Sequence, residues 1–225
     1  MSVNLPAYNK VMAELAPHKA SLVAVSKVKP ASDIQALYDA GQRIFGENYV
    51  QELQEKHPIL PADIEWHFIG HLQSNKVKYI APFVSMIHAV DSLRLLEEID
   101  KQAAKHHRII RCLLQVHIAE EETKFGLDES ELREVLTQWK AQADKFQHIR
   151  IAGFMGMATN TENMEQVRAE FRRLKALQTQ LKATFAPGDE QLTELSIGMS
   201  GDYTIALEEG STMVRIGSML FGARS

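Results

Sequence analysis

The chain has 225 residues, of which 45% are hydrophobic and 24% charged, and its formal net charge is -4. These values are ordinary for a soluble globular protein, and the mildly negative charge argues against a general surface for nucleic acid. The only cysteine, Cys112, excludes an intramolecular disulfide, and we expect it to be buried because its neighbours are apolar. No apolar run approaches the roughly 20 residues of a membrane span. The first residues, MSVNLPAYNK, lack a signal-peptide core, so we expect a cytoplasmic protein.

Strand-like and helix-like segments alternate along the chain. Apolar residues at helical spacing from Tyr8 to Leu15 predict an N-terminal helix, and the apolar run from Leu22 to Val25 predicts a strand buried on both faces. We expect a helical segment after each of the first seven strands. The expected strands cover residues 22–26, 43–45, 65–69, 86–89, 109–118, 149–155, 192–197 and 213–216.

Polar residues predict where five of the helices begin. Ser32 with Gln35, and Thr159 with Glu162, match the capping-box pattern. Asn48 with Gln51 can cap the helix after the second strand, and Ser92 and Asp202 each precede another helical segment.

Eight strands alternating with helices in about this length are typical of a (β/α)8 barrel, whose usual size is roughly 250 residues. A doubly wound open sheet of the same elements is the alternative. No linker or low-complexity segment interrupts the alternation. We therefore predict an α/β fold, a single TIM-type (β/α)8 barrel with an extra N-terminal helix, in which residues 1–225 form one domain.

The segment from Ser21 to Pro30, SLVAVSKVKP, places Lys27 where the first buried strand stops. A lysine at the C-terminal end of a buried strand is costly to hold as a desolvated cation, so its pKa tends to fall. The neutral amine that results attacks carbonyls and forms Schiff bases. The alternative is that the ammonium group of Lys27 reaches solvent from the tip of the strand.

The loops after the seventh and eighth strands are rich in glycine and serine. They read SIGMSGD over residues 196–202 and RIGS over residues 215–218. In a (β/α)8 barrel these two loops commonly bind phosphate. Their glycines let backbone N–H groups approach an anion, and Ser200 and Ser218 add hydroxyl donors. The alternative is that the glycines only shape tight turns.

In a closed barrel the first strand neighbours the eighth, so the amine of Lys27 and the two phosphate-binding loops would face one cavity. A ligand that has both an aldehyde and a phosphate fits such a cavity, and pyridoxal 5′-phosphate is the clearest candidate. A phosphorylated sugar aldehyde, handled by a Schiff-base aldolase, is the main competitor.

Five motifs, spread in order over essentially the whole chain, resemble those of the pyridoxal phosphate homeostasis proteins of the YggS type. That family is a single-domain barrel similar to the N-terminal domain of alanine racemase, and it holds its vitamin B6 cofactor as a Schiff base. The motifs are AVSK with Lys27, FGEN with Asn48, HFIGHLQSNK at residues 67–76, LSIGMSGD at residues 195–202 and STMVRIGSMLFG at residues 211–222.

The resemblance implies a cofactor contact for six residues. Lys27 would form the Schiff base, Arg215 would face the pyridine nitrogen and Asn48 would lie near the phenolic oxygen. The phosphate would be held by Ser200, Gly217 and Ser218. The family often has threonine where this chain has Ser218, and serine keeps the hydroxyl donor.

Arg215 bears on whether the protein is an enzyme. Guanidinium has hydrogen-bond donors and no acceptor, so a ring nitrogen bonded to it must be unprotonated, which weakens the ring as an electron sink. Alanine racemase adds a second domain and a tyrosine base, and we expect neither here because the chain ends at Ser225. We therefore expect a monomeric carrier that takes part in pyridoxal phosphate homeostasis and supplies cofactor-dependent apo-enzymes. The alternatives are a racemase-like enzyme, the aldolase, and a scaffold that has lost its ligand.

Other motifs point to no further ligand. His67 and His71 are separated by Gly70 and a predicted strand end, so they do not form a helical metal-binding pair. We expect no bound metal, no nucleic acid and no membrane association.

Overall fold

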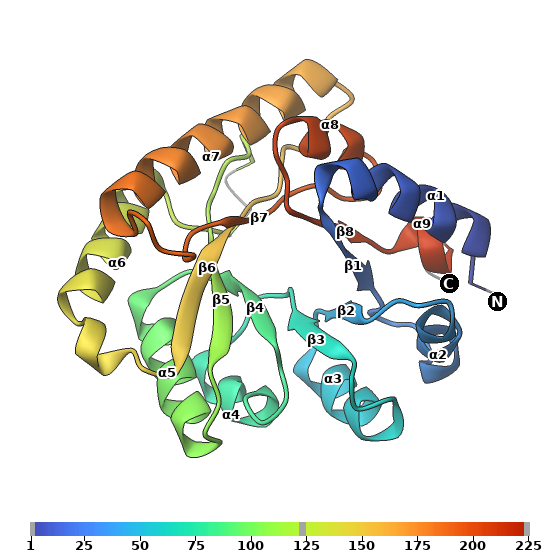
Figure 1. Cartoon of the computed structure of the whole chain (residues 1–225), viewed down its shortest axis with the longest axis horizontal. Coiled ribbons are helices and arrows are strands. Elements are labelled where there is room, and N and C mark those ends of the chain that lie inside the picture. Colours follow the sequence, from blue (N-terminus) through green and yellow to red (C-terminus); the bar gives the residue numbers. More distant parts are fainter. Residues whose placement is uncertain (1–2, 122–124, 223–225) are drawn as a thin grey trace.

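The structure is a computed structural model that describes residues 3–121 and 125–222. Eight parallel strands follow one another in chain order and close into a barrel in which β1 pairs with β8 (Figure 1). This confirms the predicted (β/α)8 barrel and rules out the open sheet. The strands are β1 (Ser21–Val25), β2 (Ile44–Glu47), β3 (Glu65–Phe68), β4 (Met86–Val90), β5 (Ile110–Gln115), β6 (Ile149–Met155), β7 (Glu194–Ser196) and β8 (Met213–Ile216).

Helices surround the barrel, and at least one follows each of the first seven strands (Figure 1). These are α2 (Ala31–Asp39), α3 (Val50–Lys56), α4 (Val77–Ile80), α5 (Leu93–Lys105), α6 (Glu129–Ala141), α7 (Met164–Phe185) and α8 (Tyr203–Glu208). Short 3-10 turns cover Ala16–His18, His57–Ile59, Ser74–Lys76 and Ala143–Lys145. Among the helices of the described residues, none has the length and apolar character needed to cross a bilayer.

The predicted extra N-terminal helix is α1 (Leu5–Leu15), which precedes the barrel. It begins where it does because the Asn4 side chain accepts a hydrogen bond from the N–H of Ala7 at 3.1 Å and Pro6 occupies the first turn. A helix that the sequence did not predict, α9 (Ser218–Phe221), follows β8 and packs beside α1 (Figure 1). The N–H of Asn4 donates to the carbonyl of Leu220 at 2.8 Å, which joins the two segments.

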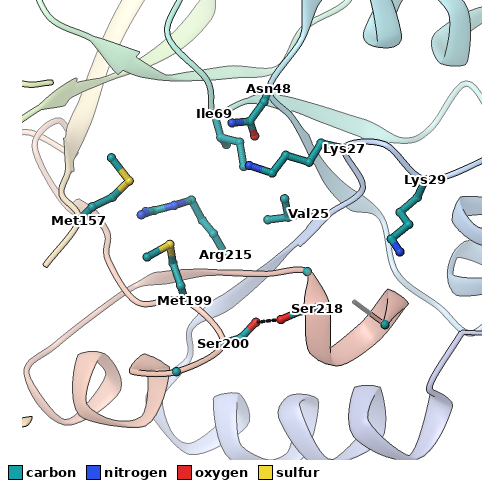
Figure 2. Close-up of a pocket in the computed structure, with 13 residues that line it drawn as sticks. Val25, Lys27, Lys29, Asn48, Ile69, Met157, Met199, Ser200, Arg215 and Ser218 are labelled. Atoms are coloured by element: carbon teal, nitrogen blue, oxygen red, sulfur yellow. Dashed lines mark hydrogen bonds between the residues drawn. The ribbon is translucent and has the colours of Figure 1, made fainter. Parts of the chain in front are cut away.

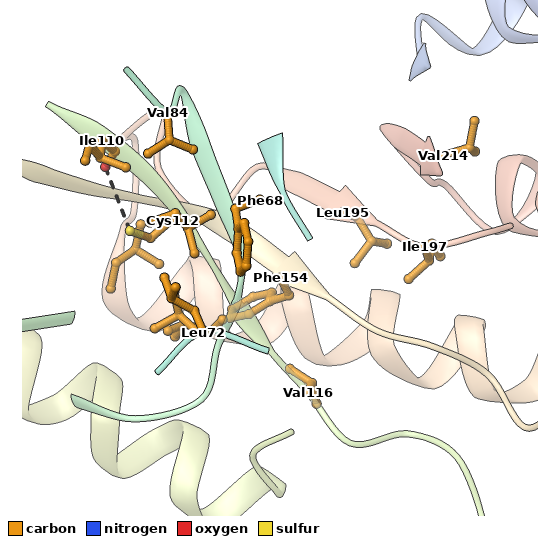
Figure 3. Packing of buried hydrophobic residues seen from close by; sticks show 14 of the residues in the cluster. Phe68, Leu72, Val84, Ile110, Cys112, Val116, Phe154, Leu195, Ile197 and Val214 are labelled. Carbon is orange, nitrogen blue, oxygen red and sulfur yellow. Dashed lines mark hydrogen bonds between the residues drawn. The ribbon is translucent and has the colours of Figure 1, made fainter. Parts of the chain in front are cut away.

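Alternate residues of the strands enter two separate apolar layers. Outward-facing residues pack under the helices, and Figure 3 shows Phe68, Val84, Cys112 and Phe154 in this layer. Cys112 is fully buried there, as expected from its neighbours. A smaller cluster fills the inside of the barrel, formed by Val23, Met86, Ala89, Leu113, Ala152, Met155 and Met213.

Helix α8 begins directly after Asp202 as predicted, although the Asp202 side chain does not cap it, and α3 begins at Val50 with Tyr49, not Asn48, as its N-cap residue. The predicted starts at Ser32 and Thr159 are wrong. Helix α2 begins at Ala31 directly after Pro30, which leaves Ser32 inside the helix. The hydroxyl of Thr159 donates to Glu170 at 2.6 Å, and α7 begins five residues later, capped by Asn163. The prediction for α5 is confirmed, since the Ser92 hydroxyl accepts from the N–H of Leu95 at 3.3 Å.

Strand β7 is shorter than predicted. It covers three residues, and Leu192, the first residue of the predicted strand, has a φ of 57°, which no β-strand allows.

Candidate functional site

A cavity of about 320 Å³ lies where strands β1, β2, β7 and β8 end. In Figure 2, Val25 and Ile69 stand beside it, and the side chains of Met157 and Met199 lie on the opposite side. All six residues that the sequence singled out line this cavity. They are Lys27, Asn48, Ser200, Arg215, Gly217 and Ser218.

Lys27 lies in a tight turn just beyond β1. The N–H of Lys29 donates to the carbonyl of Ser26 at 3.1 Å and closes this turn. The side chain of Lys27 is half-buried and extends into the cavity towards Ile69 (Figure 2). The amine is therefore directed inward, and the alternative of a strand-tip lysine extended into bulk solvent does not describe it.

Ser200 and Ser218 stand together on one wall of the cavity, although they come from different loops. The Oγ of Ser218 donates to the Oγ of Ser200 at 3.2 Å (Figure 2). The loop of Ser200 is shaped by Gly198, whose φ of +97° is accessible mainly to glycine. The side chain of Asp202 then accepts from the N–H of Met199 at 2.6 Å and tightens the turn. Within the described chain, the N–H groups of Ser200 and Gly201 donate to no acceptor, so they are available to an anion.

Arg215 is the most deeply buried charged group in the cavity, with only 5% of the residue exposed. Its Nη1 donates to the carbonyl and to the Oγ of Ser196, both at 2.7 Å, and its Nη2 donates to the carbonyl of Gly156 at 3.1 Å. Guanidinium has five N–H donors, and the Nε–H takes part in no hydrogen bond with the described residues. Burial lowers the pKa of Arg215 to about 10, so the group remains a cation at neutral pH.

A chain of buried hydrogen bonds continues from Arg215 into the barrel. The Oγ of Ser196 lies 3.0 Å from Nδ1 of His88, and Nε2 of His88 lies 2.9 Å from Nδ1 of His67. Burial lowers the pKa of His67 to about 3 and that of His88 well below its usual value, so both rings are neutral.

The charge of Arg215 sets the direction of this chain. Because guanidinium can only donate, the Oγ of Ser196 accepts from it, and the hydroxyl group of Ser196 then donates to Nδ1 of His88. His88 then has its proton on Nε2 and donates to His67. Nε2 of His67 is buried and has no hydrogen-bond partner in the described part of the protein.

This series of hydrogen bonds was not predicted from the sequence, in which His67 was weighed only as a metal ligand. Strand alternation could have indicated it, because alternation places residues 67, 88, 196 and 215 on the inward faces of their strands. No three His, Cys, Asp or Glu side chains within residues 3–121 and 125–222 come close enough to hold a metal ion. His71 instead stacks on Phe125 and pairs with Asp91 at 3.5 Å.

Asn48 follows β2 and lies at the opposite wall of the cavity from the serines (Figure 2). Its side-chain oxygen is buried and has no hydrogen-bond partner among the described residues. Gly70 packs directly against the Asn48 backbone, where a Cβ atom at position 70 would clash with the carbonyl of Asn48. This close approach fixes the backbone of Asn48 at the edge of the cavity.

Comparisons with known proteins identify the relatives of this chain. The family described as alanine racemase, N-terminal domain, matches residues 7–225. The chain is 39% identical over 206 residues to the pyridoxal phosphate homeostasis protein of Aquifex aeolicus, covering 91% of this chain and 87% of the relative. It is 38% identical over 213 residues to the protein of the same name from Escherichia coli K12, covering 92% and 87%.

Solved structures extend the comparison. PipY of Synechococcus elongatus with pyridoxal phosphate bound superposes with a TM-score of 0.86 at 36% identity, covering 96% of this chain and 99% of that one. Alanine racemase from Bartonella henselae shares the fold, with a TM-score of 0.70 at 18% identity. That match covers 99% of this chain and 60% of the racemase chain.

Proposed function

Because the chain belongs to the pyridoxal phosphate homeostasis proteins, built on the alanine racemase N-terminal domain, we propose that it binds pyridoxal 5′-phosphate in the cavity around Lys27. The observation that supports this most directly is the meeting of an amine, a guanidinium and a pair of hydroxyl groups in one cavity. These groups come from the two ends of the chain and are brought together by the pairing of β1 with β8.

The residues fit the cofactor group by group. Ser200, Ser218 and the undonated N–H groups of Ser200 and Gly201 suit a phosphate. The unused Nε–H of Arg215 suits the pyridine nitrogen, and the side-chain amide of Asn48, whose oxygen has no partner among the described residues, suits the polar edge of the ring. When bound, the cofactor would supply an aldehyde with which the amine of Lys27 would form a Schiff base, with the release of one molecule of water.

Arg215 favours a carrier over a catalyst. A group that only donates holds the ring nitrogen unprotonated, so the ring withdraws little electron density from a bound amine. Three of the guanidinium hydrogen bonds are already made to the protein, which keeps this donor in place. We therefore propose that the protein stores and delivers the cofactor and turns over no substrate.

We further propose that residues 1–225 act as one domain and work as a monomer in the cytoplasm, supplying cofactor-dependent apo-enzymes. The names of the relatives support a role in cofactor homeostasis. A cavity lined by six candidate residues of a single chain supports the monomer, since no second subunit is needed to complete it.

The test is covalent labelling. The protein is incubated with pyridoxal 5′-phosphate, its visible absorption is recorded, and sodium borohydride then fixes the adduct for peptide mass mapping. We expect the label on Lys27, its loss in Lys27→Ala, and its retention in Lys29→Ala, which alters a lysine of the same cavity. Absence of colour and of label, or label only on other lysines, would refute the proposal. Trapping only with a sugar phosphate would favour the aldolase.

The absence of turnover has its own test. Amino acids are incubated with the loaded protein in deuterium oxide, and exchange at the α-carbon is followed by mass spectrometry. We expect no exchange above that of free cofactor. Rapid exchange would show a racemase-like enzyme instead.

A further inference from the structure

The residues before and after Lys27 are hydrogen-bonded to an ionic cluster. None of the side chains of this cluster is among the proposed cofactor contacts. On one side, the Oγ of Ser26 donates to Glu47 at 2.7 Å, and the carbonyl of Ser26 accepts from Nζ of Lys56 at 2.9 Å. On the other side, the N–H of Val28 donates to Glu52 at 2.8 Å. The residues before and after Lys27 are thus tied to the same group of side chains.

The cluster is formed by Glu47, Glu52 and Lys56. Nζ of Lys56 lies 2.7 Å from a carboxylate oxygen of each glutamate, and the side chain of Lys56 is 10% exposed. Glu47 is fully buried, and burial raises the pKa of its carboxyl while Lys56 opposes that shift. Buried ion pairs of this kind add little net stability compared with apolar packing, so stability alone is a weak reason for the cluster.

The backbone of Val28 is strained in the turn that presents Lys27. Its φ is 57°, in the left-handed region, where β-branched residues are genuine outliers. L-residues disfavour this region, so its population is roughly 5- to 30-fold lower than that of the right-handed region. The side chain of Val28 is 57% exposed, so burial does not offset the strain. A strained conformation persists only when its surroundings hold it, and here the Val28 N–H is bound by Glu52.

We propose that Glu47, Glu52 and Lys56 are positioning residues that hold the strained turn at Val28 so that the amine of Lys27 points into the cavity. The inference rests on the proposed function, since it assigns a purpose to the direction of Lys27. None of the three side chains lines the cavity, so they act through the turn.

The experiment separates the rate of covalent attachment from affinity. Attachment of pyridoxal 5′-phosphate to Lys27 is stopped with borohydride at timed intervals, and affinity is measured with pyridoxine 5′-phosphate, which has no aldehyde. We expect Glu52→Met and Lys56→Met each to slow attachment about tenfold, with less than a threefold change in affinity for the unreactive analogue. The matched control is Glu129→Met, which alters an exposed ion pair on α6 and leaves the turn untouched.

Rescue distinguishes positioning from general support of the fold. Glycine adopts positive φ without penalty, so adding Val28→Gly to Glu52→Met should restore the attachment rate to within about threefold of the unaltered protein. A general packing defect would not be repaired by glycine at an exposed position. Failure of this rescue, or attachment at the unaltered rate in Glu52→Met and Lys56→Met, would overturn the inference.

Hydrogen exchange gives a readout that needs no cofactor. We expect the Val28 amide, which lies at an exposed position, to be protected in the unaltered protein and to lose that protection in Glu52→Met, while the amides of β1 stay protected. An unprotected Val28 amide in the unaltered protein would overturn the inference even if a variant failed to fold. Failure of the unaltered protein to be labelled at Lys27 would instead refute the proposed function.

Discussion

The hydroxyl oxygens of Ser200 and Ser218 lie 3.2 Å apart on one wall of the cavity, each at the end of a different strand of the barrel. A hydrogen bond of this kind contributes about 1 kcal/mol. We expect Ser200→Ala and Ser218→Ala each to weaken binding of pyridoxine 5′-phosphate about fivefold, measured by fluorescence titration. Binding of pyridoxine without the phosphate should not change. Equal losses for both ligands would show that the serines do not contact the phosphate.

Replacing Arg215 by lysine keeps the charge and removes the planar donor group. The carbonyls of Ser196 and Gly156 and the hydroxyl of Ser196 would then share one ammonium. Leaving a buried acceptor without a donor costs about 1–3 kcal/mol, so we expect Arg215→Lys to lower the free energy of unfolding by that amount. Urea denaturation measures it, with Arg150→Lys as a control at an exposed position. Equal stability of the two variants would contradict the hydrogen bonds described.

The buried histidines make stability depend on pH. An unfolded histidine titrates near about pH 6.5, whereas burial lowers the pKa of His67 to about 3 in the folded protein. Between these values the unfolded chain binds the extra proton, so the free energy of unfolding falls as the pH is lowered, by about 1.4 kcal/mol per pH unit for this residue. We expect His67→Gln to reduce the slope measured between about pH 5.5 and 4.5 by roughly that amount.

The control for this pH dependence is His18→Gln, which alters an exposed histidine. We expect it to leave the slope unchanged. A slope that is the same in His67→Gln and in the unaltered protein would mean that His67 is protonated in the folded state.

Two glycines form a matched pair for stability. A Cβ atom at Gly153 would overlap the carbonyl of Glu194, its partner in the pairing of β6 with β7, whereas a Cβ atom at Gly201 would meet nothing within 4 Å. We expect Gly153→Ala to cost about 3 kcal/mol or more of unfolding free energy and Gly201→Ala less than about 1 kcal/mol. Thermal and urea unfolding of both variants test this, and a tolerated alanine at position 153 would contradict the close approach of the strands.

Much of the barrel could be predicted because its signals are local. Apolar runs bounded by polar residues predicted all eight strands. Because parallel strands of a barrel end at one face, the sequence also predicted that Lys27, Ser200 and Arg215 lie in one cavity. Strand order then followed from the fold class.

What the sequence did not reveal depends on partners far along the chain. Thr159 looks like a helix cap until Glu170 is placed beside it. Likewise, lysine and glutamate are usually exposed, and only the placing of β2 and α3 shows that Glu47 and Lys56 are hydrogen-bonded to Ser26. Local patterns contain no information about such contacts, and they do not predict the positive φ of Val28, whose N–H donates to Glu52.

The closing of the barrel by β1 and β8 also has a consequence for how a newly made molecule acquires its ligand. Protein synthesis proceeds from the amino terminus, so Lys27 leaves the ribosome long before Ser218 has been added to the chain. The amine proposed to form the Schiff base is therefore made well before the last of the loops proposed to bind the phosphate. A chain interrupted before β8 would contain Lys27 and lack Arg215, Gly217 and Ser218.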